Sequence, residues 1–530
     1  MPDRHRTGRI VATIVGTAVV LAVAFLLAPP MGTDLSAQVA RADFFARHGY
    51  APIDFGWYGG VNQFGYSLFT AALGAAFGVR LVGAVAAVVS AAALGYLLLR
   101  WDAHRPLLGG VLGAAVLVGN LVSGRITFAV GLAFALMALA VLSVRRRLPR
   151  GIRLGLAAVL AAVATWASPV AGLYVGVAGG ALLLAALSRR TDDGWRLGRQ
   201  LPESLVLCLA PAIALAPMAL LFGNGGVQPF TAESMRINVA LAVVVLLVLP
   251  RQQRVVRFGA ALTALLLVLA YYLPSPIGSN AMRLPMLFAV PVLAAFATLD
   301  RRWLAALLAA TVWWQPPVMT SDLGRMGGVE PSAAFYRPLL DELQRRGPVG
   351  RVEVVPLRDH WESTHVAAVV PLARGWERQV DVDRNPLFYR TGLSSDDYHT
   401  WLKRNAVSYV ALASASPPDR YAREEAALVV AGTPYLREVW RDATWRLYAV
   451  VDAAPLVNAP GRLLESTQNG VRFHADGPGE VLVRLHWSRW LTLDGTGGCL
   501  APDPEGWTIV RSTTAGEQSI SSGLRPGPFC

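Results

Sequence analysis

The sequence predicts a polytopic α-helical membrane protein with an exported C-terminal half, built from an α/β layer and a β-sandwich. The chain has 530 residues, 54% of them hydrophobic, and a mean hydropathy of +0.43. This composition is too apolar for a soluble globular protein. The apolar residues concentrate before residue 319, whereas the composition from residue 319 onward is that of an ordinary soluble domain.

The first element is a series of about eleven spans, since a membrane-crossing helix needs about 20 apolar residues. The intervals that meet or approach this length are 10–29, 81–99, 106–122, 126–144, 154–168, 170–188, 203–222, 237–250, 258–273, 284–299 and 302–318. The N-terminal interval is expected to be a retained helix, because its apolar core is longer than that of a signal peptide. Residues 63–79 predict an interfacial or re-entrant helix, or an extension of the next span.

Arginine placement predicts the topology. Nineteen arginines fall in one set of alternate loops and six in the other. The positive-inside rule then gives a cytoplasmic N-terminus and an extracytoplasmic C-terminal half, in a multi-pass protein of the cytoplasmic (inner) membrane. The net charge of +13 has the same origin: 25 arginines face 10 acidic residues before residue 319, against 23 basic and 25 acidic residues after it. A nucleic-acid partner is therefore not expected.

The polar interval 31–63 holds the acidic side chains expected on the outer side, Asp34, Asp43 and Asp54. We interpret it as a catalytic first outer loop within a membrane module of residues 1–318. Asp34 is the candidate catalytic residue. The alternative for Asp34 is an N-cap of the helix that begins at Leu35.

Three arginines are expected at outer helix ends, Arg125, Arg236 and Arg283. One interpretation is that each anchors its helix by reaching the headgroups. The other is that they bind a lipid phosphate on the face that holds the aspartates. Glu233 and Asn280 add polar groups to the same expected surface.

The C-terminal half predicts an α/β domain over 319–455 and a β-sandwich over 456–530. Expected helices are 332–346, 395–404 and 422–430, expected strands are 351–355 and 407–412, and residues 436–451 form a hairpin. From residue 456 onward, short alternating runs such as EVLVRLHW are separated by Gly and Pro, which is typical of a sandwich.

Within the α/β domain, Trp376 and Arg378 belong to a dense polar and aromatic segment. Such a segment suits either sugar recognition or the docking of this domain onto the membrane half. The segment HWESTH, which begins at His360, lacks the spacing of an HExxH zinc motif, and no metal ligand set is predicted. The sequence contains no nucleotide-binding glycine loop, which disfavours an ATP-driven pump.

Cys499 and Cys530 lie in the same predicted β domain and in an oxidising compartment, so we expect a disulfide between them. Cys208 falls within a span and is expected to be reduced and buried.

Two motifs, GTD at Gly32–Asp34 and SGRITFAVG at Ser123–Gly131, together with the topology of residues 1–320, resemble the GT-C superfamily of membrane glycosyltransferases. This superfamily includes YfhO-like and actinobacterial arabinosyl- or mannosyltransferase-like members. The resemblance implies an enzyme of the cell envelope that takes sugar from a polyprenyl-phosphate donor and passes it to a glycan or lipid acceptor. No tight acidic pair follows the first helix, so no cofactor is assigned and dependence on a divalent metal stays open.

The mechanism implied is an inverting transfer, with Asp34 as base and Arg125 and Arg283 as the phosphate clamp. The alternative classes are a multi-span transporter or flippase and a non-catalytic envelope-assembly protein. A transporter predicts an internal repeat with charges near the midplane, and neither is evident in the sequence.

Overall fold

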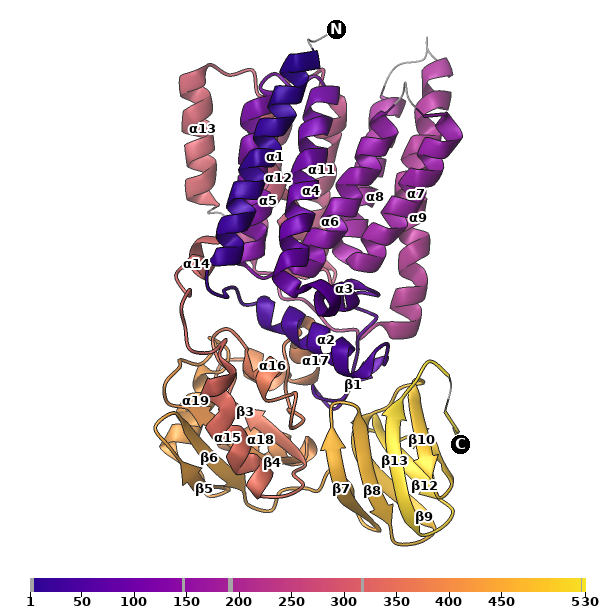
Figure 1. The fold of residues 1–530 in the computed structure, drawn as a ribbon, viewed down its shortest axis with the longest axis vertical. Helices are drawn as coiled ribbons and strands as arrows, with labels where there is room; N and C mark the ends of the chain where they lie inside the picture. Colours follow the sequence, from indigo (N-terminus) through magenta and orange to yellow (C-terminus); the bar gives the residue numbers. More distant parts are fainter. Residues whose placement is uncertain (1–3, 145–147, 189–193, 316–318, 526) are drawn as a thin grey trace. The chain divides into compact units, whose positions relative to one another are not determined.

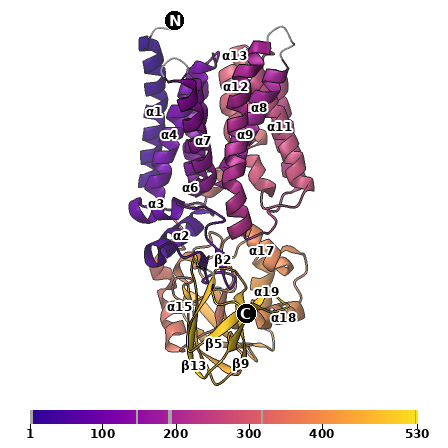
Figure 2. The ribbon, with the colours of Figure 1, turned by 90° about the vertical axis from the view of Figure 1, so that its right-hand side faces the viewer.

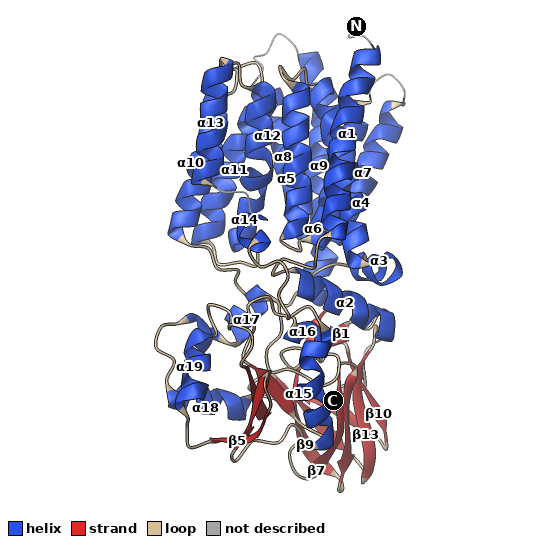
Figure 3. Cartoon of the chain, turned by 60° about the vertical axis from the view of Figure 1, so that its left-hand side comes forward, coloured by secondary structure: helices blue, strands red, loops and turns tan. Residues whose placement is uncertain are grey.

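The computed structural model describes residues 4–144, 148–188, 194–315, 319–525 and 527–530. The chain forms two compact units: residues 1–35 with 65–326, and residues 36–64 with 327–530. The first unit is helical and the second contains the strands, as Figure 3 shows by colour.

The helical unit consists of long apolar helices that lie side by side (Figures 1 and 2). Within the described residues its helices are α1 (Arg4–Leu27), α3 (Thr70–Phe77), α4 (Val79–Arg100), α5 (Pro106–Val122), α6 (Ile126–Ser143), α7 (Arg150–Ala167), α8 (Pro169–Leu187), α9 (Gly194–Phe222), α10 (Ala232–Val248), α11 (Arg254–Tyr272), η1 (Gly278–Met282), α12 (Arg283–Phe296), α13 (Arg301–Trp314) and α14 (Met319–Leu323).

Each of the eleven intervals expected to span contains one of these helices in the part of the chain that the structure describes. There, eight helices are long and apolar enough to cross a membrane, whereas α5, α10 and α13 have 17, 17 and 14 residues. The fold class, a multi-pass helical membrane protein with a β-rich C-terminal region, is confirmed. The end of the interval 302–318 lies outside the described residues.

Small residues let these helices approach closely. A Cβ added at Gly95 would lie 3.0 Å from the Ile14 side chain, and one added at Gly110 would overlap the same side chain. Helix α1 therefore packs on α4 and α5 through a single isoleucine set against glycines. Packing through small residues replaces the hydrophobic driving force that membrane helices lack.

The second unit begins with residues 36–64 and continues with an α/β layer. Its first elements are α2 (Leu35–His48), β1 (Ile53–Asp54), β2 (Val61–Asn62), α15 (Ala333–Arg345), β3 (Arg351–Val354), α16 (Glu362–His365), α17 (Arg378–Arg384), η2 (Pro386–Tyr389), α18 (Ser395–Arg404), β4 (Val407–Ala413), α19 (Arg423–Ala431), β5 (Leu436–Arg441) and β6 (Trp445–Val450). The sheet order is β3-β4-β6-β5, in which β3 and β4 are parallel and the other pairs antiparallel.

The rest of this unit is a sandwich of antiparallel sheets, ordered β10-β13-β8-β7 and β11-β12-β9. The strands are β7 (Gly461–Thr467), β8 (Gly470–Ala475), β9 (Gly479–His486), β10 (Leu491–Gly495), β11 (Gly498–Pro502), β12 (Trp507–Ser512) and β13 (Gly516–Ser522). Inward-facing residues such as Phe473, Val481 and Val510 form its core. This alternation is the pattern from which the sandwich was predicted.

The segment 36–64 is built into the second unit. Ile53 and Phe55 belong to the sandwich core, and the Phe55 N–H donates to the Gln468 carbonyl at 2.9 Å. The Gly56 carbonyl accepts from the Leu372 N–H at 2.9 Å, which ties the same segment to the α/β layer. The units therefore divide the chain differently from the expected ranges, in which the whole interval 31–63 belonged to the membrane module.

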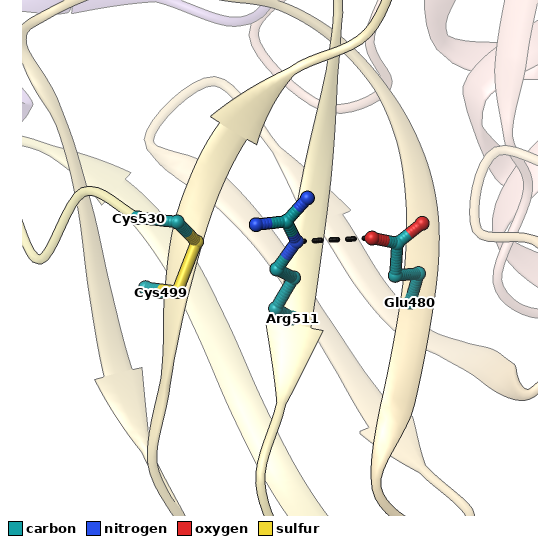
Figure 4. Close-up of a disulfide and its surroundings, with 4 residues drawn as sticks. All are labelled: Glu480, Cys499, Arg511 and Cys530. Atoms are coloured by element: carbon teal, nitrogen blue, oxygen red, sulfur yellow. Dashed lines mark hydrogen bonds and ion pairs between the residues drawn. A yellow bond between two sulfur atoms is a disulfide. The ribbon is translucent and has the colours of Figure 1, made fainter.

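The disulfide between Cys499 and Cys530 is present, as expected (Figure 4). It joins β11 to the last residue of the chain, and the Leu500 N–H also donates to the Pro528 carbonyl at 2.8 Å. The C-terminal segment is thus held by both a covalent bond and backbone hydrogen bonds. Cys208 is a free, partly buried thiol.

We predict that alkylation of the denatured, unreduced protein labels one cysteine, Cys208, and that prior reduction raises the number to three. Closing a loop with a sequence separation of 31 residues stabilises a fold by about 3 kcal/mol on the chain-entropy estimate, so Cys499→Ser should lower stability by that order. Mass spectrometry of the labelled protein decides the pairing. Labelling of all three thiols before reduction would contradict it.

Candidate active site

Asp34 lies between two arginines of the helical unit. Its Oδ2 is 3.4 Å from Arg125 Nε and 3.9 Å from Arg283 Nη2. The Asp34 side chain is 29% exposed, compared with 22% for Arg125 and 16% for Arg283. The structure therefore brings together three residues that are separated by up to about 250 positions in the sequence, and it leaves the carboxylate partly open.

The position of Asp34 depends on a contact between two backbone turns. The Asp34 N–H donates to the Ser123 carbonyl at 3.2 Å. Gly32 and Gly124 have φ values of +94° and +77°, which favour glycine. A Cβ added at Gly32 would lie 2.7 Å from the Gly124 nitrogen, and one at Gly124 would lie 2.7 Å from the Leu35 Cα. The GTD and SGR segments thus touch through their main chains, and neither turn has room for a side chain at its glycine.

Arg283 is held at the start of α12. Its guanidinium lies over the Phe128 ring, with Cζ 5.2 Å from the ring centroid. The preceding turn, η1, is fixed by the Tyr174 hydroxyl, which donates to the Asn280 carbonyl at 2.6 Å. The side-chain amide of Asn280 donates to the Pro276 carbonyl at 3.3 Å, so Asn280 takes part in the local turn rather than in a described contact with Asp34.

A second acid that the sequence analysis did not select joins this cluster. Asp322 in α14 is 5% exposed, and its Oδ2 accepts a hydrogen bond from Ser123 Oγ at 2.6 Å. Burial raises the pKa of the Asp322 carboxyl, the Ser123 hydrogen bond and Arg325 lower it, and the nearby negative charge of Asp34 raises it. The one available signal was its place as the first acidic residue after the last expected span.

The other outward residues of the predicted site are not joined to Asp34. Glu233 and Arg236 are exposed side chains in the first turns of α10. In the described residues no hydrogen bond or ion pair links either of them to Asp34, Arg125 or Arg283. For Arg236, the snorkelling interpretation fits this exposure better than a role in this cluster.

Asp43 and Asp54 belong to the second unit. Asp43 lies on an exposed position of α2, whereas Asp54 is 1% exposed. Burial raises the pKa of Asp54 to about 7, against the lowering effects of the Gly56 N–H, which donates to its Oδ1 at 2.8 Å, and of Arg41. Asp54 therefore closes the turn that ties residues 36–64 into their unit.

Trp376 and Arg378 form a packed cluster in the α/β layer. The Trp376 ring stacks on His360, with centroids 3.4 Å apart, and the Arg378 guanidinium lies 4.4 Å from the centroid of the Trp376 ring. The indole of Trp376 thus contacts two charged or polar side chains of its own unit and stays partly exposed. The Arg378 Nη1 also donates to the Tyr389 hydroxyl at 3.1 Å.

The neighbouring residues of that segment dock residues 36–64 within the same unit. Glu377 Oε2 lies 2.6 Å from Arg41 Nη2, and both side chains are buried. The Glu377 N–H donates to the Tyr58 hydroxyl at 3.1 Å. A Cβ added at Gly375 would overlap Trp57. The contacts of this segment are therefore with residues 36–64 of its own unit.

The HWESTH segment is arranged as core. Burial raises the pKa of Glu362 well above its usual range and lowers the pKa of His365, whose ring nitrogen contacts the Pro331 carbonyl at 3.1 Å. Among the residues that the structure describes, no group of three or more His, Cys, Asp or Glu side chains is placed to hold a metal ion.

The Asp34 cluster places two arginines beside a single partly open carboxylate. Such a pair of guanidinium groups suits a phosphate or other oxyanion, which accepts charge-assisted hydrogen bonds. The carboxylate beside them is suited to accept a proton from a hydroxyl group. The arrangement therefore has the groups that an anion site and a base require.

Fold and site together define a multi-pass membrane protein with a partly open acid–arginine cluster in its helical unit. The structure is similar to that of the arabinofuranosyltransferase AftD from mycobacteria, with a TM-score of 0.48 and 14% sequence identity, over 97% of this chain and 57% of that one. A variant of AftD gives a TM-score of 0.47 and 13% identity, over 97% of this chain and 60% of the other.

This chain thus spans less than two thirds of the length of either AftD chain. No protein-family model matches the chain, and no curated protein matches it.

We predict that Gly124→Ala disrupts the contact between the GTD and SGR turns, because it adds both an overlap with Leu35 and the cost of a positive φ. Gly225→Ala is a matched control: its φ is +69° and nothing lies within 4 Å of the added Cβ, so it carries the backbone cost of about 1 kcal/mol alone. Thermal unfolding of the detergent-solubilised protein should show a clearly larger decrease in melting temperature for Gly124→Ala than for Gly225→Ala. Equal decreases would mean that the close contact between the turns does not contribute to stability.

Proposed function

We propose that this protein is an integral membrane glycosyltransferase that takes a polyprenyl-phosphate-linked sugar and builds a cell-envelope glycan or glycolipid on the outer face of the cytoplasmic membrane. The observation that carries the proposal is Asp34 placed between Arg125 and Arg283. The motifs that hold this cluster are those on which the resemblance to membrane glycosyltransferases rests.

The reaction is an inverting transfer. An acceptor hydroxyl oxygen attacks the anomeric carbon, the bond from that carbon to the phosphate oxygen breaks, and the bonding electrons leave with the phosphate. Asp34 takes the proton of the hydroxyl, and Arg125 and Arg283 balance the charge that develops on the leaving phosphate. Each of the three residues thereby has one role, and no covalent enzyme intermediate is required.

The ion pairs of Asp34 fit this order of events. Both arginines face the same carboxylate oxygen, at 3.4 and 3.9 Å, and the longer contact is at the outer limit of an ion pair. A bound phosphate offers these arginines better acceptor geometry than the single shared oxygen does. Donor binding would therefore draw the guanidinium groups away from Asp34 and free its carboxylate for the proton.

An apolar cavity supports a donor carried on a hydrocarbon chain. It has a volume of about 220 Å³ and lies among α4, α6, α8, α10, α11 and α12. Its wall begins at Tyr174 and Leu284, the residue after Arg283, and reaches Trp101 and Phe296. Twelve residues of α12 separate Leu284 from Phe296, which is about 18 Å at about 1.5 Å per residue. A chain whose phosphate sits at Arg283 would have this apolar path beside it.

We predict that Asp34→Asn lowers kcat by about 100-fold or more, because it removes the base, while donor affinity does not fall, because the phosphate no longer competes with a carboxylate for the arginines. Arg283→Ala should instead lower kcat/KM for the donor by about 10-fold to 100-fold, because that is the effect of removing one charge-assisted hydrogen bond. The control is Arg254→Ala, an exposed arginine at the start of α11. Sugar transfer by the purified, correctly inserted protein from a polyprenyl-phosphate donor is the measurement.

The results separate the alternatives. If Asp34→Asn keeps more than about a tenth of the activity, Asp34 is not the base. If Arg254→Ala is as harmful as Arg283→Ala, the arginines act through topology. If the intact protein moves lipid across vesicles and transfers no sugar, it is a flippase.

We predict that Ala260→Phe narrows the cavity and raises the KM for a long-chain polyprenyl donor about tenfold, since overpacking a filled site costs about 1–3 kcal/mol. A short geranyl-phosphate donor, which does not reach Ala260, should be used as before. Val159→Phe is the control, because Val159 is 60% exposed on α7 and outside the cavity. An equal loss with both donors would show that the cavity does not hold the chain.

A further inference from the structure

We propose that Asp322 is a positioning residue of the Asp34 site: it holds Ser123 and thereby sets both the base and the arginine clamp. Only the expected effect on kcat rests on the proposed function. The effect on the position of the turn that holds Asp34 can be measured without any transfer reaction.

The first step is the bond that Asp322 makes. Its carboxylate is 5% exposed and accepts from Ser123 Oγ at 2.6 Å. A hydroxyl that donates to a carboxylate forms a short, strong hydrogen bond. Ser123 itself is 2% exposed, so water does not compete for the hydroxyl. A buried bond of this kind fixes the rotamer of Ser123 and the turn to which it belongs.

The second step is what Ser123 touches. Its carbonyl accepts the N–H of Asp34 at 3.2 Å, and a Cβ added at the next residue, Gly124, would overlap the main chain of Asp34 and Leu35. Arg125 follows directly, with its Nε 3.4 Å from Asp34 Oδ2. A single serine therefore lies between the carboxylate of Asp322 and both functional groups. If the turn shifts, the base and one arginine shift with it.

The third step is electrostatic. The charges of Asp34 and Asp322 act on each other, and Arg125 acts on Asp322 as well. Arg125 thus stands in the field of two carboxylates, of which only Asp34 is partly open. Asp322, buried and hydrogen-bonded, is not available to take a proton from an acceptor, so its role is to hold the turn and partly to balance Arg125.

The hydrogen bond between Asp322 and Ser123 joins two segments that are far apart in the sequence. Asp322 and Ser123 are 199 residues apart, and α14 follows the last apolar helix, α13. A five-residue helix has little stability of its own, so the buried side-chain bond also fixes the segment that carries it. The same bond therefore orders both the SGR turn and the beginning of the chain that leaves the helical unit.

The test uses the purified protein and variants at two positions, Asp322 and Ser123. Asp322→Ala and Ser123→Ala each remove the bond, and Asp322→Asn keeps the shape with a weaker, neutral bond. The matched control is Asp300→Ala, an exposed aspartate that precedes α13 and makes no side-chain cap hydrogen bond. The two readouts are kcat for sugar transfer and hydrogen exchange of the backbone amides of residues 32–36.

We expect kcat to fall about tenfold or more in Asp322→Ala and Ser123→Ala, the effect of losing one hydrogen bond to a charged group. Asp322→Asn should lie between these variants and the wild type. The double variant should be no worse than either single variant, since both remove the same interaction. The amide of Asp34 should exchange faster in every variant that weakens the bond, and should be unchanged in Asp300→Ala.

Unchanged exchange in Asp322→Ala would overturn the positioning role, whatever happens to kcat. A decrease in kcat in the double variant that equals the two single decreases combined would overturn the positioning role too, because the two residues would then act separately. If the wild type transfers no sugar but exchange responds as expected, the proposed function fails and the positioning role of Asp322 stands. Should Asp322→Ala not fold, the isosteric Asp322→Asn supplies the same comparison.

Discussion

The Asp34 site depends on one close contact, where the main chain at Gly32 meets the main chain at Gly124. Both residues have positive φ and neither has space for a Cβ, so the two turns approach to a distance that only glycine permits. The hydrogen bond from Asp34 to Ser123 and the ion pair with Arg125 are consequences of that approach. Asp34 and Arg125, which directly precede α2 and α6, are thereby held together by backbone, which is stiffer than two side chains.

The first polar interval serves both units by dividing at residue 35. Residues up to Leu35 belong to the helical unit, and residues 36–64 are built into the second unit. The aspartates divide with it: Asp34 is partly open between arginines, whereas Asp54 is buried with a raised pKa and closes a turn. The same residue type thus has a proposed chemical role in one environment and a structural role in the other, because burial disfavours the charged form.

Under the proposed function, the charge balance of the helical cluster favours an anionic ligand. Asp34, Asp322, Arg125 and Arg283 bring equal numbers of acids and arginines, but Asp322 is committed to Ser123 and only Asp34 is partly open. An incoming phosphate can therefore replace the carboxylate of Asp34 as the partner of the arginines without leaving a buried charge unpaired. A neutral ligand would bring no such replacement.

Local signals in the sequence were sufficient for the helices, for the hairpin of β5 and β6, and for the bounds of α18, because hydrophobic periodicity and turn residues act over a few positions. The disulfide also followed from the sequence, since only two cysteines share the β domain. That Arg125 and Arg283 share a face with Asp34 was inferred from the place of the two arginines at helix ends, whereas their ion pairs with Asp34 come from the structure.

Only the tertiary structure decided that Asp322 bonds Ser123, that residues 36–64 join the second unit, and that Trp376 stacks on His360. These are contacts between buried side chains or turns far apart in the chain, up to 328 residues for Thr364 and Ser36. Which partners meet at such distances depends on how helices and sheets pack, and packing leaves no periodic trace in the sequence.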